Sequence, residues 1–183
     1  FSERRGDDAA QTTRMIDLAA AQFLPLLGAG FFQVCYVTSD LDGGMRQLAA
    51  LHGIERFRVR RDVPSLPGMP RMTLHQAHVY LGDLQLELIQ PAGGDDAVYR
   101  DFCAADGTLR HHHYGLWVDD PSEYSALPGR CAALCLRIAM EIAVPGVGGA
   151  VYVDFRRALG HYVEYIHLAP QVKAGYYADV PRY

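Results

Sequence analysis

The sequence lacks the long apolar and long basic runs that would point directly to a membrane or to a nucleic acid. No apolar run approaches the ~20 residues that a membrane-spanning helix requires. The formal net charge is −4, so the sequence also lacks the electrostatic signature of a protein that binds nucleic acid or an anionic membrane. We interpret the one basic cluster, Arg58 to Arg61, as the solvated edge of a strand. Neither a nucleic acid nor a membrane is therefore an expected partner.

The cysteines lack an organised pattern. Four are present, and their positions show neither a zinc-binding spacing nor a disulfide framework. Reduced thiols fit a reducing compartment, so we expect a cytoplasmic protein. Half of the residues are hydrophobic, which excludes a disordered chain, and 183 residues suffice for one domain or for two small fused modules.

The order of predicted elements repeats along the chain. An N-terminal arm, residues 1–30, contains a predicted helix over 11–27 that packs on the core. A first module over 31–91 and a second over 111–168 are joined by a linker, 92–110, and each runs strand, helix, then three strands. In the C-terminal tail, 169–183, we expect the residues from Pro170 onward to lie extended across the surface. The predicted strands of the modules are 31–38, 57–63, 73–80, 84–90, 112–118, 135–143, 150–155 and 162–168, and the predicted helices are 41–52 and 122–134.

Polar residues recur at matching places in the two modules. Gln33 opens the first strand of the first module, and His113 lies in the corresponding strand of the second. Glu87 and Glu164 follow them at nearly the same sequence distance, each in the middle of an otherwise apolar strand. A glutamate in such a place is costly to bury unless it is paired or bound to a metal. Finding this twice, in step, indicates a duplicated unit with one shared site.

The strand that carries His113 begins with three consecutive histidines. Strict alternation of faces predicts His111, His113, Gly115 and Trp117 on one face and His112, Tyr114, Leu116 and Val118 on the other. A register slip of one or two positions would bring His112 or His111 to the site instead. In another predicted strand, His75 and His78 fall on opposite faces, and we expect a structural or pocket-lining role for both.

Two βαβββ units with these four polar positions in register resemble the vicinal oxygen chelate superfamily, which includes glyoxalase I, methylmalonyl-CoA epimerase, extradiol dioxygenases and bleomycin-resistance proteins. The resemblance covers residues 31–168. It implies an α+β fold in which the two modules form a cupped mixed sheet with helices outside. It also implies that four inward residues meet on one divalent metal ion, namely Gln33, Glu87, His113 and Glu164.

A ligand set of Gln, Glu, His and Glu in this order looks like the glyoxalase I type. Three side-chain oxygens and one imidazole nitrogen suit a six-coordinate Zn²⁺, Ni²⁺, Co²⁺ or Mn²⁺ ion better than Fe²⁺, with open positions for substrate or water. The resemblance implies a lyase or isomerase that removes a proton beside a carbonyl or vicinal diol oxygen of a small-molecule substrate. Glu164 is the expected base, and Glu87 is its expected partner that returns the proton. A homodimer is also expected.

Two other functions compete with this prediction. The same cupped fold serves metal-free, ligand-sequestering proteins of the bleomycin-resistance type, although the inward carboxylates argue against that function. An extradiol-type dioxygenase would need two histidines and one carboxylate on Fe²⁺, and Gln33 stands where the first histidine belongs. No obvious pair of basic residues is available for the carboxylates of glutathione, so the sequence predicts the reaction class better than the substrate.

Overall fold

A computed structural model describes residues 30–65 and 69–183 of the chain. The helix predicted over 11–27 lies outside the described residues. The elements are β1 (Phe31–Val37), α1 (Leu41–His52), β2 (Arg58–Pro64), β3 (Met72–Leu81), β4 (Leu84–Gly94), α2 (Ala97–Arg100), β5 (Arg110–Trp117), α3 (Pro121–Ala133), β6 (Ile138–Val144), β7 (Gly148–Asp154), α4 (Arg156–Leu159), β8 (Tyr162–Leu168) and α5 (Pro170–Tyr176).

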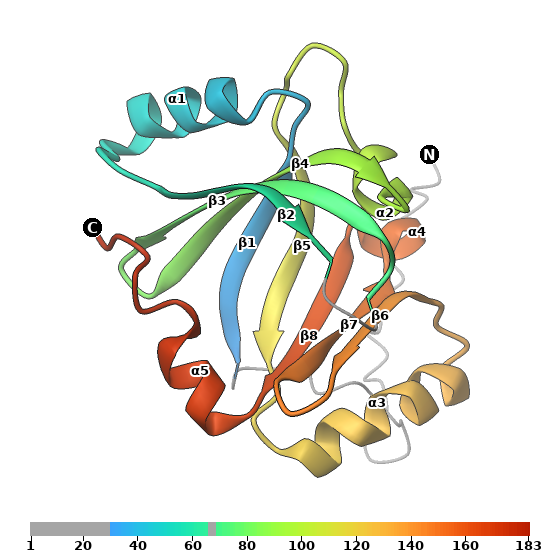
Figure 1. The fold of residues 1–183 in the computed structure, drawn as a ribbon. Coiled ribbons are helices and arrows are strands. Elements are labelled where there is room, and N and C mark those ends of the chain that lie inside the picture. The colour runs from blue at the N-terminus through green and yellow to red at the C-terminus, as the bar shows by residue number, and fades with distance from the viewer. Residues whose placement is uncertain (1–29, 66–68) are drawn as a thin grey trace, which may run out of the picture.

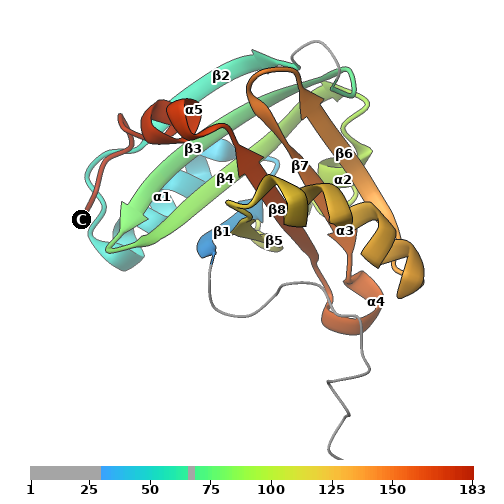
Figure 2. The ribbon, with the colours of Figure 1, turned by 90° about the horizontal axis from the view of Figure 1, so that it is seen from below.

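The eight strands form one sheet in the order β2-β3-β4-β1-β5-β8-β7-β6. Within each module the first strand pairs in parallel with the last, β1 with β4 and β5 with β8, and β1 and β5 pair antiparallel to join the modules. The sheet curls, with α1 outside the strands of the first module and α3 outside those of the second (Figure 1, Figure 2). The predicted α+β fold of two βαβββ modules is confirmed. The division of the chain at 91 and 111 stays a prediction.

Local chemistry sets the ends of α1 and the turn of the first hairpin. The Asp40 carboxylate accepts a hydrogen bond from the backbone N–H of Gly43, at 2.9 Å, and so satisfies one of the free donors of the first helical turn. Gly53 ends the helix in the left-handed region with φ 68°, where glycine has no steric cost. The hairpin of β3 and β4 turns at Gly82 and Asp83, as predicted.

Apolar side chains fill three regions of the sheet. One cluster lies on the concave face and includes Phe32, Ile89, Tyr152 and Ile166. Two further clusters lie on the convex face, one under α1 and one under α3. None of the helices in the described ranges has the length and apolarity that a membrane crossing would need. The concave face is thus the part of the fold where polar side chains meet an otherwise apolar lining.

The predicted alternation of faces in β5 is wrong at its start, because the strand contains a bulge. Cys35 of β1 pairs with His113, but the next β1 residue, Tyr36, pairs with His111, so His112 has no partner of its own. The bulge turns His112 onto the concave face beside His113. His111 instead lies on the convex face, against the rings of Tyr36 and Tyr114.

The C-terminal tail is not extended throughout, contrary to the prediction. Residues Pro170–Tyr176 form α5, with Pro170 in the first turn, where a missing N–H costs nothing. After α5 the chain crosses to the first module and bonds to β3 (Figure 1): Tyr80 N–H donates to Pro181 O at 2.8 Å, and Tyr183 N–H donates to Tyr80 O at 3.0 Å. The tail therefore ties the second module to the outer strands of the first.

Candidate metal centre

The four predicted ligands lie on the four central strands of the sheet. Gln33 is in β1, Glu87 in β4, His113 in β5 and Glu164 in β8, and all four are buried. From His113 Nε2 the distances are 3.1 Å to Glu164 Oε2, 3.4 Å to Gln33 Oε1 and 3.5 Å to Glu87 Oε2. Three oxygens from both modules therefore surround one ring nitrogen.

These distances fit a shared divalent ion. Donor atoms about 2.1 Å from an ion and at right angles to each other lie about 3 Å apart, so small side-chain movements would bring the three oxygens and the nitrogen onto one centre. Two carboxylates, an amide oxygen and an imidazole are donors that Zn²⁺, Ni²⁺, Co²⁺ and Mn²⁺ accept. The side chains present thus fit the ion that the resemblance implies.

Charge balance in the metal-free site rests on His113. Burial opposes its protonation, but the charge and hydrogen bond of Glu164, and then those of Glu87, outweigh burial and raise the pKa of His113 to about 9. Burial likewise opposes ionisation of Glu87, yet hydrogen bonds from His113 and His78 hold its pKa well below the usual range. At neutral pH an imidazolium therefore takes the place of a cation beside these carboxylates.

Two neighbours fix the amide of Gln33. Its Nε2 donates to Gln85 Oε1 at 2.7 Å, which leaves Gln33 Oε1 directed at His113. Gly115, on the adjacent strand, supplies the space for this side chain, because a Cβ at that position would lie 2.7 Å from Gln33 Oε1. The oxygen of Gln33 is thus held at the site by the protein itself.

Glu87 is held by a chain of residues that reaches the tail. His78 Nε2 lies 3.0 Å from Glu87 Oε1, and Arg58 Nη2 lies 3.4 Å from His78 Nδ1. A guanidinium can only donate, so His78 Nδ1 accepts and His78 Nε2–H donates to the carboxylate. Arg58 also donates to Asp179 Oδ1 at 2.7 Å and to Tyr176 O at 3.0 Å.

The interpretation of Arg58 as part of a solvated strand edge is therefore wrong, although Arg60 and Arg61 are exposed. Arg58 is 9% exposed because its guanidinium is covered by the tail, and its partner Asp179 comes from a distant part of the sequence. Alternation along the strands was the sequence signal that could have placed Arg58 near the site. Arg58 and Arg60 share a face of β2, and they pair with His78 and Gln76 of β3, which line the same cavity. For His78, the predicted pocket-lining role is confirmed.

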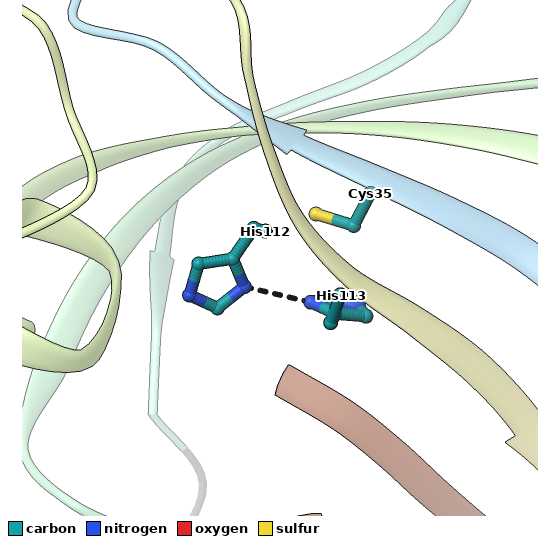
Figure 3. A group of neighbouring side chains, drawn as sticks. All are labelled: Cys35, His112 and His113. Carbon is teal, nitrogen blue, oxygen red and sulfur yellow. Dashed lines mark hydrogen bonds between the residues drawn. The ribbon is translucent and has the colours of Figure 1, made fainter. Parts of the chain in front are cut away.

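A second group of donors shares His113 with this site. Cys35 Sγ and one ring nitrogen each of His112 and His113 lie within 4.8 Å of one another, the one such group of three His, Cys, Asp or Glu side chains found in the part of the chain that the structure describes (Figure 3). The two Nδ1 atoms are 2.8 Å apart, a hydrogen-bond distance. Burial, and next the charge of Glu87, raise the pKa of the Cys35 thiol well above its usual value. Neutral thiol and hydrogen-bonded rings make this group a poorer metal site than the Nε2 side.

A cavity of about 120 Å³ adjoins the site. Gln33, Glu87 and Glu164 line it, together with Tyr99, Tyr152 and the tail residues Tyr176 and Tyr177. A second cavity of about 130 Å³ shares Glu164, Tyr176 and Tyr177 and is otherwise mostly apolar, with walls from β6, β7 and β8. The hydroxyls of Tyr99 and Tyr152 lie 2.9 Å apart, and burial above all raises the pKa of both well above the usual value, so both stay protonated. The site can thus take a small ligand with a polar end near Glu87 and an apolar end beyond Glu164.

Comparison with known proteins gives a sequence match and a fold match. The sequence profile of the Glyoxalase/Bleomycin resistance protein/Dioxygenase superfamily matches residues 32–128, just over half of the chain. No curated protein matches the chain in sequence.

Similar folds occur in methylmalonyl-CoA epimerases. A variant of the Streptomyces coelicolor enzyme in complex with 2-nitronate-propionyl-CoA has 17% sequence identity and a TM-score of 0.52, over 78% of this chain and 96% of that chain. The enzyme from Mycobacterium tuberculosis has 17% identity and a TM-score of 0.51, over 81% of this chain and 96% of that one. At these identities the likeness concerns the fold alone.

Proposed function

The chain belongs to the glyoxalase/bleomycin resistance protein/dioxygenase superfamily, and on that premise we propose that it is a divalent-metal-dependent lyase or isomerase of the glyoxalase type. The substrate we propose is a small carbonyl compound with an oxygen on the adjacent carbon. One observation carries the proposal: two buried carboxylates from different modules converge on Nε2 of one buried histidine beside a cavity.

We propose Gln33, Glu87, His113 and Glu164 as the residues that hold the ion, with Zn²⁺, Ni²⁺, Co²⁺ or Mn²⁺ as the candidates. When bound, such an ion polarises a carbonyl and makes a proton on the adjacent carbon more acidic. The chain's part is to lose the Nε2 proton of His113, to keep its carboxylates ionised, and to surround the substrate with the two cavities.

Glu164 is the proposed base, because the two carboxylates differ in how they are held. Both oxygens of Glu87 have partners, His78 at Oε1 and His113 at Oε2, and its low pKa makes it a weak proton acceptor. Glu164 borders both cavities and therefore lies where the polar and apolar ends of a ligand would meet. Glu87 is better suited to anchor the ion, because its low pKa also opposes the protonation that it would need in order to return the proton.

The pair of tyrosine hydroxyls supports a ligand with a partly negative oxygen. Tyr99 and Tyr152 share one hydrogen between them, so the other hydroxyl hydrogen is available to a ligand in the cavity that both residues line. A neutral donor in a buried site stabilises charge that develops on a substrate oxygen. We propose that this pair binds the oxygen of the carbonyl as the adjacent proton leaves.

Metal-free sequestration of a ligand is the second candidate function. The observation in its favour is that protonated His113 lies within ion-pair distance of both buried carboxylates and offsets one of their two charges without an ion. A dioxygenase centre with two histidines is less well supported, because both ring nitrogens of His112 have partners away from the carboxylates.

Metal analysis followed by an exchange assay tests the proposal. We expect about one divalent ion per chain, and uptake of deuterium from D₂O into a 2-hydroxy or 2-oxo carbonyl compound. If the stripped protein takes up none of Zn²⁺, Ni²⁺, Co²⁺ or Mn²⁺ in calorimetry, the sequestering function replaces the enzyme. If it binds an ion but promotes no exchange in any such compound, proton abstraction is refuted.

The homodimer and the cytoplasmic location stay predictions from sequence. Sedimentation equilibrium of the purified protein and localisation of the tagged protein in its own cells would test them.

A further inference from the structure

The bulge in β5 places two consecutive histidine rings on the concave face, and their hydrogen bonds form a short chain. His112 Nε2 lies 2.8 Å from the backbone carbonyl oxygen of Val98, a residue of α2. His112 Nδ1 lies 2.8 Å from His113 Nδ1 (Figure 3). Both rings are fully buried. Their polar atoms therefore depend on each other and on Val98 for partners.

The positions of the hydrogens in this chain follow from what each atom can do. A carbonyl oxygen only accepts, so His112 Nε2 must carry a hydrogen. In a neutral ring the other nitrogen, Nδ1, is then an acceptor. A doubly protonated His112 would place a second positive charge in a fully buried position next to His113, and no carboxylate among the described residues contacts its ring to offset that charge. The short contact between the rings is thus His113 Nδ1–H donating to His112 Nδ1.

We propose that His112 is a positioning residue that holds His113 with a hydrogen on Nδ1, so that Nε2 of His113 is the nitrogen left to bind an ion beside Gln33, Glu87 and Glu164. The proposal rests on the proposed metal centre and deepens it. A histidine that binds a metal through one nitrogen usually donates its other N–H to a carboxylate, a backbone carbonyl or water. Here the acceptor is a second histidine, and the backbone carbonyl of Val98 sets the state of that ring.

The opposite arrangement of hydrogens is costly. With its hydrogen on Nε2, a neutral His113 would place its Nδ1 lone pair 2.8 Å from that of His112, between two fully buried rings. Burying two acceptors against each other without a hydrogen between them costs free energy and disfavours that tautomer. The same cost applies whenever His112 is replaced by a side chain that cannot accept a hydrogen bond at this point.

Two variants separate this role from packing. In His112→Asn, Oδ1 takes the place of Nδ1 and can accept from His113, while the contact with Val98 is lost. In His112→Gln, the amide nitrogen takes the place of Nε2 and can donate to Val98, while the acceptor for His113 is lost. We expect Zn²⁺ affinity, measured by chelator competition, to stay within about threefold of wild type in His112→Asn and to fall about 10- to 100-fold in His112→Gln. Equal losses, or a larger loss in His112→Asn, would overturn the proposal.

The wild-type protein gives a second test that does not depend on how the variants fold. In long-range ¹H–¹⁵N spectra of the Zn²⁺-loaded protein we expect His112 to carry its hydrogen on Nε2 and His113 to carry its hydrogen on Nδ1. A hydrogen on His112 Nδ1 would overturn the proposal. A wild-type protein that takes up no metal would instead refute the metal centre itself, whereas metal uptake with equal affinity in the two variants would refute only the role of His112.

Discussion

Metal uptake should release a proton from His113. The pKa of this ring is raised to about 9 in the metal-free protein because, against burial, Glu164 and Glu87 stabilise the imidazolium. Nε2 must lose its proton before it can bind an ion. Since pH 7 is about two units below the pKa of this ring, removal of the proton costs about 2.7 kcal/mol and lowers the apparent affinity for the ion about 100-fold. Affinity should therefore rise about tenfold per pH unit between pH 7 and 9 and then level off.

Titration calorimetry in buffers of different ionisation enthalpy measures this release. We expect about one proton per ion at pH 7 and roughly a quarter of a proton at pH 9.5. Glu87 contributes none, because its pKa lies far below this range. The control is Glu164→Gln, which removes the largest influence that raises the pKa of His113, so less proton should be released at pH 8. Two results together would refute this account of the site: the wild type releases no proton on metal uptake at pH 7, and its affinity for the ion does not change up to pH 8.5.

Three further predictions concern catalysis, stability and the supporting glycine. Glu164→Gln should keep its metal and lose ~10²- to 10⁴-fold in kcat, whereas Glu87→Gln should lose less rate but more metal affinity. Exchange assays at saturating metal measure both rates. A wild-type rate in Glu164→Gln would mean that Glu164 is a ligand and not the base. Because the pKa of His113 is higher in the folded, metal-free protein than in the unfolded chain, protonation of His113 stabilises the fold. This contribution is fully present below pH 6.5, the pKa in the unfolded chain, and is lost as the pH rises through about 9. Urea unfolding should show this decline in the wild type, and a metal-free His113→Gln control should lack it. Gly115→Ala should displace the Gln33 amide and weaken metal binding about 10- to 100-fold with the fold retained by circular dichroism; unchanged affinity would mean that Gln33 is not a ligand.

The parts of the fold that depend on neighbouring residues could be predicted from the sequence. The capping aspartate and Gly53 define α1, and the Gly82–Asp83 turn defines a hairpin, because each is set by contacts within a few residues. The internal repeat allowed the site to be predicted as well. A glutamate recurs in a late strand of each module, at nearly the same distance from Gln33 and from His113, and this recurrence predicted that the four side chains lie together, which local patterns could not do.

The parts that depend on distant residues could not be predicted. The bulge in β5 is a property of its pairing with β1, so the sequence of three histidines predicts the wrong face for two of them. Arg58 is buried by Asp179 and the backbone of the tail, and the residues next to Arg58 in the sequence do not predict this contact. The tail from Pro170 onward was likewise expected to lie extended, yet α5 begins at Pro170.

The two modules meet where β1 pairs with β5, and this boundary, here called the seam, has a consequence for the stability of the protein. Gln33 and Glu87 belong to one module and His113 and Glu164 to the other, so a module that folded alone would own only two of the four donors. The free energy of binding an ion would then count toward docking the two halves and not toward the folding of either one. Loaded protein should unfold as a single unit, while stripped protein can separate first along the seam. A single module would need a second copy of itself to surround an ion, whereas a chain that carries both modules brings the four donors together whatever its concentration.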